Sequence, residues 1–312
     1  MADYGCHALI RLCCYAFADA TCLLDQLCYS HRAMWDIIDL PFFQRALAAA
    51  ALVGFTNGFF SGFVILRRTA LSVSALSHTM LPGIAVAIMI TGALTQLNAF
   101  LGALIAALIV GLGSVAVSRG NRVAQGTALA VLYTSAFAGG VALLPRLGVR
   151  QELEHWLFGD INAVSNGDLW TVFWIGVLTL ILANLLMRPI LVALFEPNVA
   201  AAQGVPVRFV QYLLFAMMVM SLVASLQAVG CVLSVGLLVT PAATISLFTD
   251  RTAALFWGGG ILGAVGAVLA VWISVPLQLT SGPAIVMMLG MLFLLGWLFS
   301  PKYGVLFRRR VA

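Results

Sequence analysis

Charged residues are scarce in this sequence. Only 9% of its 312 residues are charged, while 62% are hydrophobic, and a soluble globular domain carries about 25% charged residues. No acidic residue occurs between Asp39 and Glu152, and Lys302 is the only lysine. The composition therefore excludes an ordinary soluble domain.

Several motifs of catalysis and energy coupling are also missing. A Walker-type ATP site needs a lysine inside its G-x-x-x-x-G-K-[ST] loop, but Lys302 lies in the C-terminal tail. The protease motif H-E-x-x-H is absent. The predicted spans hold no intramembrane carboxylate of the kind that gradient-driven carriers use for coupling. These absences disfavour an intramembrane enzyme, an ATPase and a secondary carrier.

What the sequence has instead is a series of apolar runs. Runs of about 20 apolar residues are long enough to cross the ~30 Å hydrocarbon core of a bilayer as helices. We therefore predict an all-α, polytopic membrane bundle of about eight or nine transmembrane helices within residues 41–312. The nine apolar segments lie at residues 46–66, 70–94, 97–117, 126–144, 168–187, 209–227, 229–248, 253–273 and 282–299.

Basic residues orient the predicted helices. Eleven of the 16 lie on one side of a nine-helix alternation, namely Arg67, Arg68, Arg119, Arg122, Arg188, Arg208, Arg251, Lys302, Arg308, Arg309 and Arg310. Because cytoplasmic loops carry an excess of Lys and Arg, we expect this side and the C-terminus to be cytoplasmic and Met34 to be outside. The basic residues are scattered at helix ends, so no nucleic-acid partner is expected.

Residues 1–40 differ in composition from the rest of the chain and are expected to lie outside the main fold. Five of the six cysteines fall in the first 28 residues, at Cys6, Cys13, Cys14, Cys22 and Cys28. Their spacing matches no common zinc-ligand pattern. We expect residues 1–33 to be either a poorly ordered extension or the result of a translation start assigned too far upstream. Met34 is a plausible first residue of the protein in the second case.

His78 is the one of four histidines that lies inside a predicted span. If it stands about nine residues into its helix, it lies ~14 Å from the end, near the bilayer midplane. Ser74 shares its face at i−4, and Ser77 adjoins it. Pro82 removes the helical hydrogen bond to the His78 carbonyl, and Gly83 allows a kink or the approach of another helix.

Two interpretations of His78 stay open on these residues alone. A neutral imidazole with oxygen donors nearby suits zinc, manganese or iron, so the histidine is a candidate metal ligand. Alternatively, it is a packing residue that forms hydrogen bonds across the helix bundle.

Three stretches resemble motifs of one protein family. The run "LRRTALSVSALSHTMLPG" is similar to L-R-R-x-A-L-x-G-D-A-L-S-H-A-x-L-P-G of the permease subunits of bacterial metal ABC transporters, the ABC-3 family. "LEHWLFGDINAVSNGDLW" and "AVGCVLSVGLLVTPAATISLF" resemble two further motifs of that family, in the same order. The resemblance covers about residues 42–300.

The resemblance implies a type II ABC importer-like fold and a transport subunit that is not an enzyme. It implies a divalent metal ion as transported substrate, with no permanently bound cofactor. The implied partners are cytoplasmic ABC ATPases, a periplasmic or extracellular metal-binding protein, a second permease copy, identical or paralogous, and the lipid of a bacterial inner membrane. A gradient-driven secondary metal carrier or channel is the alternative function.

The resemblance also implies roles for particular residues. His78, Ser74 and Ser77 would line the metal pathway, with a helix kink at Pro82 and Gly83. The family has an aspartate where this chain has Ser74. A hydroxyl in place of a carboxylate weakens the binding of hard cations, so the affinity and identity of the metal are left open.

Residues 240–256 are expected to form the element that contacts the ATPase. The candidate coupling residues in it are Pro241, Ala242, Ala243, Asp250 and Arg251. Pro241 is expected to break its helix. A second loop at residues 195–208, which includes Ala200 and Gly204, is expected to pack beside it. Ordinary connecting loops are the alternative interpretation of both segments.

On the opposite side, residues 145–168 form a polar loop. It carries Glu152, Glu154, His155, Asp160 and Asp168. We expect it either to receive metal or dock a binding protein, or to be an ordinary solvated loop.

Overall fold

The structure is a computed structural model that describes residues 41–92, 95–120, 123–147, 164–274 and 280–300. The cysteine cluster and the predicted N-terminal extension lie outside the described residues. The described part of the chain is helical, as the apolar runs predict. Its helices are α3 (Pro41–Leu66), α4 (Ala70–Thr91), α5 (Gln96–Gly120), α6 (Gln125–Leu147), α8 (Asn166–Leu185), α9 (Met187–Phe195), α10 (Pro197–Ala202), α11 (Val207–Val229), α12 (Cys231–Ser246), α13 (Thr252–Ser274) and α14 (Ser281–Phe299).

Each of the nine predicted apolar segments corresponds to one of these helices. Eight of them are long and apolar enough to cross a membrane. The ninth, α12, is shorter, with 16 residues, or about 24 Å at 1.5 Å per residue. Gly230 separates it from α11 with a φ of +82°, a conformation that glycine adopts without steric cost. The prediction of eight or nine spans is confirmed by length and composition.

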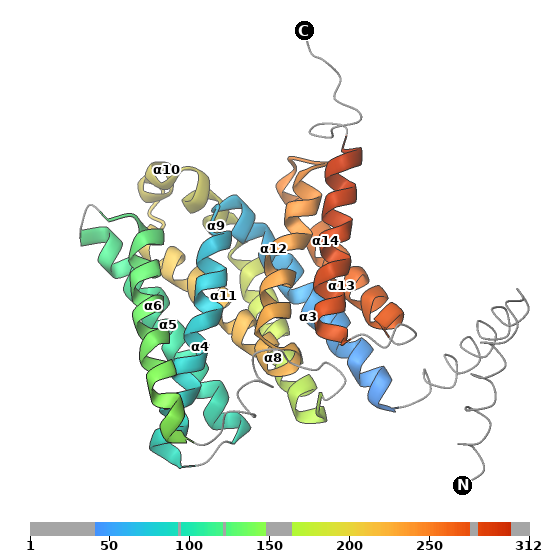
Figure 1. Ribbon diagram of the computed structural model, residues 1–312. Helices are drawn as coiled ribbons and strands as arrows, with labels where there is room; N and C mark the ends of the chain where they lie inside the picture. The colour runs from blue at the N-terminus through green and yellow to red at the C-terminus, as the bar shows by residue number, and fades with distance from the viewer. Residues whose placement is uncertain (1–40, 93–94, 121–122, 148–163, 275–279, 301–312) are drawn as a thin grey trace, which may run out of the picture.

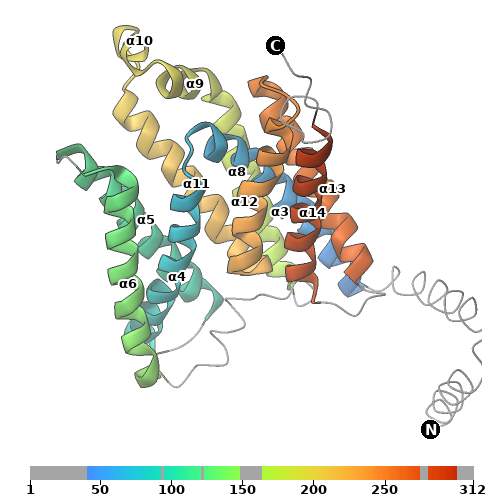
Figure 2. The ribbon, with the colours of Figure 1, turned by 45° about the horizontal axis from the view of Figure 1, so that its top comes forward.

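Successive membrane helices run in opposite directions (Figures 1 and 2). The α3–α4 turn, α9, α10, the α12–α13 turn and the end of α14 gather at one end of the bundle. We call it the basic end, because Arg67, Arg68, Arg188, Arg208 and Arg251 lie there. The opposite end, here the far end, holds the start of α3 and the start of α8. The predicted alternation of the described basic residues is therefore confirmed.

Helix α3 lies at the centre of the bundle and contacts α13 most closely. A Cβ atom on Gly54 would lie 2.5 Å from the carbonyl oxygen of Gly263, and one on Gly259 would lie 2.6 Å from that of Gly58. The two backbones touch at these glycines, because only a residue without a side chain permits this approach. In lipid, such close packing takes the place of the hydrophobic effect that joins helices in water.

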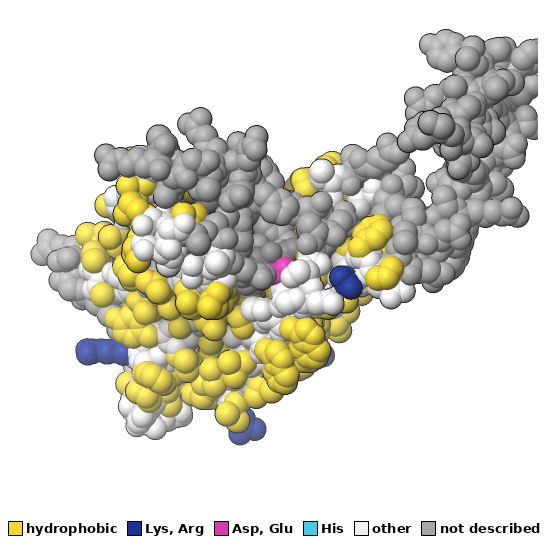
Figure 3. Space-filling view, turned by 90° about the horizontal axis from the view of Figure 1, so that it is seen from below, with side chains coloured by type: hydrophobic (Ala, Val, Ile, Leu, Met, Phe, Trp, Pro, Cys, Tyr) yellow, Lys and Arg dark blue, Asp and Glu magenta, His cyan; other side chains and the backbone are white. Residues whose placement is uncertain are grey.

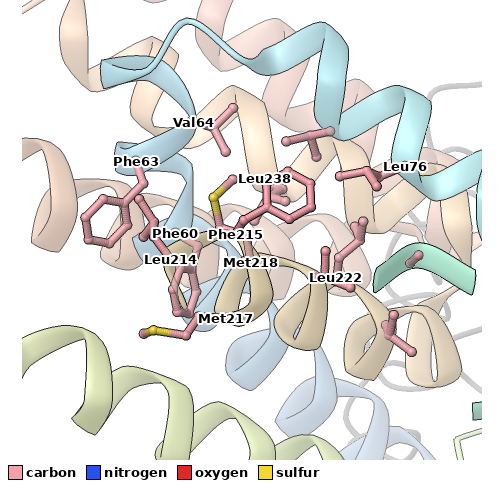
Figure 4. Packing of buried hydrophobic residues seen from close by; sticks show 14 of the residues in the cluster. Phe60, Phe63, Val64, Leu76, Leu214, Phe215, Met217, Met218, Leu222 and Leu238 are labelled. Atoms are coloured by element: carbon pink, nitrogen blue, oxygen red, sulfur yellow. The ribbon is translucent and has the colours of Figure 1, made fainter. Parts of the chain in front are cut away.

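Buried aromatic and aliphatic side chains fill the space around α3. Phe63 packs against Phe256 of α13, with ring centroids 4.4 Å apart. Toward α4, α11 and α12 the core includes Phe60, Leu214 and Leu238 (Figure 4). These contacts leave α3 almost entirely covered by other helices along its second half.

The glycine contacts generate a test of packing. We expect Gly58→Ala to lower the stability of the purified protein by about 1–3 kcal/mol, because the added methyl group would overlap the carbonyl of Gly259. Gly290→Ala is the matched control, since a Cβ at Gly290 meets no other atom within 4 Å. It should be neutral or stabilise by up to ~1 kcal/mol through helix propensity. Thermal unfolding in detergent measures both, and equal midpoints would refute the packing argument.

Candidate functional site

His78 lies eight residues into α4, about 12 Å along a helix of 22 residues. Its side chain is exposed in the single chain, while Ser74 is half-buried and Ser77 is buried. The Ser77 hydroxyl donates to the Ser74 carbonyl at 2.7 Å. The predicted arrangement of the three residues on one stretch of helix is confirmed, but the Ser77 hydroxyl is engaged within the helix.

The imidazole of His78 packs edge-on against Phe137 of α6, with ring centroids 5.9 Å apart at 70°. Within the described ranges, His78 forms no hydrogen bond with another residue. The interpretation of His78 as a hydrogen-bonded packing residue therefore finds no partner in that part of the chain. The sequence analysis did not identify Phe137, because no pattern in the sequence shows which residue of α6 lies beside His78 of α4.

Pro82 and Gly83 do not interrupt α4, which continues to Thr91. The expected kink at Pro82 and Gly83 thus stays a prediction within a continuous helix, and the close approach of another helix is confirmed. A Cβ on Gly102 of α5 would lie 2.5 Å from the Gly83 carbonyl oxygen, and one on Gly140 of α6 would lie 2.5 Å from the Cβ of Pro82. Neighbouring helices therefore pack closely on α4 at its proline, and prolines within membrane helices are common.

A groove of about 740 Å³ begins at Pro82 and Gly83 and runs between α4, α5 and α6 toward the far end. Its walls are aliphatic or small side chains, among them Val86, Leu101 and Ile105. Lacking carboxylates and imidazoles, this groove offers no strong ligand to a metal ion. No cluster of three or more His, Cys, Asp or Glu side chains occurs within the described ranges.

The expected coupling element is smaller in the structure than in the sequence prediction. Helix α12 runs through Pro241 to Ser246, and α13 starts at Thr252. Only Leu247–Arg251 forms a turn, which we call the coupling turn. The expected break at Pro241 is absent, since α12 continues through it, and the N–H of the next residue donates to the Ser61 hydroxyl of α3.

The candidate coupling residues divide into buried and exposed groups. Pro241 and Ala242 are buried, and Ala243 is half-buried. Asp250 and Arg251 are exposed on the turn at the basic end. Sequence reasoning missed a sixth residue, Phe248 of the same turn, which is 44% exposed. A large apolar side chain exposed beyond the membrane helices is typical of a partner surface.

The segment at residues 195–208 also lies at the basic end, where it contains the short helix α10. Ala200 is buried, and the N–H of Val205 donates to its carbonyl at 2.9 Å. Gly204 has a φ of +77°, which suits glycine. Phe195 is 55% exposed and Val199 is 46% exposed. This segment is thus a second exposed apolar surface at the same end.

At the far end, Glu152, Glu154, His155 and Asp160 lie outside the described residues. Asp168 is described and has a structural role as residue N3 of α8. Its carboxylate accepts from the Ser165 backbone N–H at 3.1 Å, and its own N–H donates to the Ser165 hydroxyl, which is a capping box. The described surface at this end is mostly hydrophobic with scattered charges (Figure 3).

Tryptophan marks the faces that lipid covers, a signal that the sequence alone did not resolve. The tryptophans of the described ranges are all exposed and all lie on α8, α13 and α14, at Trp170, Trp174, Trp257, Trp272 and Trp297. On α13, two of them are fifteen residues apart, or ~22 Å, near the two ends of the helix. Tryptophan favours the membrane interfaces, so these helices face lipid, whereas α4 and α6 carry none.

The family model described as "ABC 3 transport family" matches residues 39–300. The manganese transport system membrane protein MntC of Halalkalibacterium halodurans is 39% identical over 273 residues, which cover 87% of this chain and 92% of the relative. The chelated iron transport system membrane protein YfeD of Yersinia pestis is 29% identical over 260 residues, covering 83% and 86%.

The fold is similar to that of a solved structure, PsaBC from Streptococcus pneumoniae in complex with Fab. The TM-score is 0.76 at 30% sequence identity, and the match covers 87% of this chain and 97% of the other. The sequence and the arrangement of the helices thus point to the same family.

Proposed function

Since this chain belongs to the ABC 3 transport family, we propose that it passes manganese or iron along His78, at a face of α4 and α6 that a second permease copy covers. The chain is the membrane subunit of an ABC importer and not its ATPase. The metal is a transported substrate, so the site needs ligands that accept it and release it again.

The observation that carries the proposal is the exposure of His78 in the middle of a membrane-spanning helix. A polar, ionisable side chain within a span is costly unless it faces the protein interior or a water-filled cavity. In the single chain His78 packs against Phe137 and stays exposed. Another protein surface or a hydrated pathway must therefore cover the imidazole.

A second permease copy is the proposed cover. The α4 and α6 surface has no tryptophan anchor, unlike α8, α13 and α14. Alongside Phe137, α6 exposes the small or polar residues Thr134, Ser135 and Gly139. Small and hydroxylated residues are typical of helix–helix contacts in membranes. Two copies joined at this face would enclose a pathway that is lined by both His78 side chains.

The chemistry around His78 suits transfer rather than storage of the metal. Neutral imidazole binds manganese and iron, and hydroxyl or carbonyl oxygens complete a weak set of ligands. Ser74 supplies no negative charge, in contrast to the family's aspartate. A pathway site must bind well enough to admit the ion and weakly enough to let it leave. The names of the relatives support manganese and iron over zinc as the transported metals.

The basic end is proposed to face the cytoplasm, because basic residues accumulate on that side of bacterial membranes. The ATPase would then contact the coupling turn through Phe248, Asp250 and Arg251, with the surface at Phe195 and Val199 beside it. The far end would receive the metal from a binding protein, to which Glu152, Glu154, His155 and Asp160 remain candidate contacts. A gradient-driven carrier is disfavoured, because no carboxylate lies within the span interiors of the described helices.

The role of His78 is tested by replacement. We expect His78→Ala to reduce metal uptake by about ten-fold or more, the scale for losing a group from a metal site, with unchanged membrane expression. Ile90→Ala is the matched control, because Ile90 is 77% exposed on the same helix but offers no ligand. Uptake of radioactive manganese by membrane vesicles measures both. If the alanine variant takes up metal as fast as the wild type, His78 is a packing residue and not part of the metal pathway.

The role of Ser74 is tested by restoring the family's charge. We expect Ser74→Asp to increase metal retention and slow turnover, because a carboxylate ~6 Å from His78 on the same face adds a charged ligand. Ser74→Asn, of similar size without charge, is the control. Equilibrium metal binding to the purified complex and the single-turnover release rate measure the effect. Equal retention by both variants would show that Ser74 is not beside the metal.

The coupling turn is tested by charge reversal. We expect Asp250→Lys combined with Arg251→Glu to leave the chain in the membrane but to uncouple ATP hydrolysis from uptake. Reversal of Arg45, which is exposed at the far end and away from both candidate ATPase contacts, is the control. Pull-down of the ATPase and the ratio of metal transported to ATP hydrolysed measure the result. If assembly and this ratio both survive, the contact lies elsewhere, with residues 195–208 next in order.

A further inference from the structure

The hydroxyl of Ser61 joins two helices, unlike most buried hydroxyls of this chain. Ser114 and Ser225, for example, donate to the carbonyl three residues earlier in their own helices. Ser61 of α3 donates in the same way to Gly58, but it also accepts the backbone N–H of Ala242 in α12 at 3.0 Å. Ser61 and Ala242 are both fully buried.

Pro241 stands next to the residue whose backbone N–H bonds outside its helix. A proline inside a helix has no N–H to donate, and its ring crowds the carbonyl four residues earlier, here that of Leu237. The helix is therefore irregular just before Ala242. At this position Ser61 offers the N–H of Ala242 an acceptor on α3. The bond lies five residues before the coupling turn begins.

Helix α13, which leaves the coupling turn on its other side, is also attached to α3. The backbones of Gly58 and Gly259 touch, and Phe256 lies over Gly62. Phe256 also packs against Phe63. The two helices that flank the coupling turn thus contact the same short stretch of α3, residues 58–63. Helix α12 forms a hydrogen bond there, and α13 packs closely against it.

A short, well-defined turn leads from α3 to the helix that carries His78. The N–H of Arg68 donates to the Ile65 carbonyl and the N–H of Thr69 to the Val64 carbonyl, each at 3.0 Å. Arg68 has a φ of +54°, and these two bonds with a left-handed residue form a Schellman motif. A cavity of about 340 Å³ lies against this turn, lined by Leu66, Arg67 and Thr69.

We infer that the Ser61 hydroxyl positions the coupling turn on α3, so that α3 carries a displacement of the turn to α4 and His78. The inference rests on the proposed coupling role of Leu247–Arg251. Without the bond, α12 is held on α3 by packing alone, and α3 follows a displacement of the turn less completely. Fewer of the ATP molecules hydrolysed then move the pathway. Ser61 contacts neither metal nor nucleotide and is a positioning residue.

The test compares variants in the complete transporter, purified with its ATPase and reconstituted in liposomes with the metal-loaded binding protein. We expect Ser61→Ala to lower the number of manganese ions transported per ATP by at least about three-fold, the scale for loss of one buried hydrogen bond, while ATP hydrolysis continues. Ser61→Cys, of similar size but a weak acceptor, should behave like the alanine variant. Ser114→Ala, which removes a buried hydroxyl bonded only within α5, should leave the ratio unchanged.

Two outcomes overturn the inference. The first is a wild-type ratio for Ser61→Ala, and the second is a proportional fall of uptake and hydrolysis that leaves the ratio constant. The charge reversal in the coupling turn distinguishes a failure of the inference about Ser61 from a failure of the proposed function. If that reversal uncouples transport while Ser61→Ala does not, only the role of Ser61 is lost. If neither uncouples transport, the proposed coupling turn is wrong as well.

Discussion

The backbone contact between α3 and α13 is the interaction on which the rest of the structure depends. Lipid tails are as apolar as the helices, so helices associate through close packing and not through exclusion of water. Gly58 and Gly259 bring two carbonyl-bearing backbones into contact, and Phe256 fills the adjoining space over Gly62. The helices α8, α11, α12 and α14 then pack around this pair. A central helix that other helices cover almost entirely along its second half is the result.

The other helices, α4, α5 and α6, form a group that packs on itself. Gly83 against Gly102 and Pro82 against Gly140 hold this group together, and α5 joins it to α11. Figure 2 shows the three helices side by side, next to the part of the bundle that is centred on α3. His78 lies in the group of three, whereas the coupling turn lies in the part around α3. Transport requires relative motion between such parts, as in other membrane carriers that rock around a site near the midplane.

Ser74 is the point at which this chain departs from the pattern of its family. A carboxylate one helical turn from His78 would supply charge to a divalent ion, and a hydroxyl supplies only a lone pair. Electrostatic attraction for the metal must then come from elsewhere along the pathway. Two copies that each contribute His78 would provide more ligands than one chain can. Under the proposed function, the site of this chain would therefore rely more on a second copy than a site with the aspartate would.

The sequence by itself determined the membrane class, the positions of the nine apolar helices and their alternation, because hydrophobicity and charge act locally and are read along the chain. Motifs around His78 identified the family. The tertiary structure alone decided which helices touch and which faces stay exposed. Helices α4 and α12 continue through Pro82 and Pro241, where residues Gly140 and Ser61 of neighbouring helices contact them. The partnership of Ser61 with Ala242 spans 181 residues, and no local pattern encodes it, because it exists only after the helices have packed.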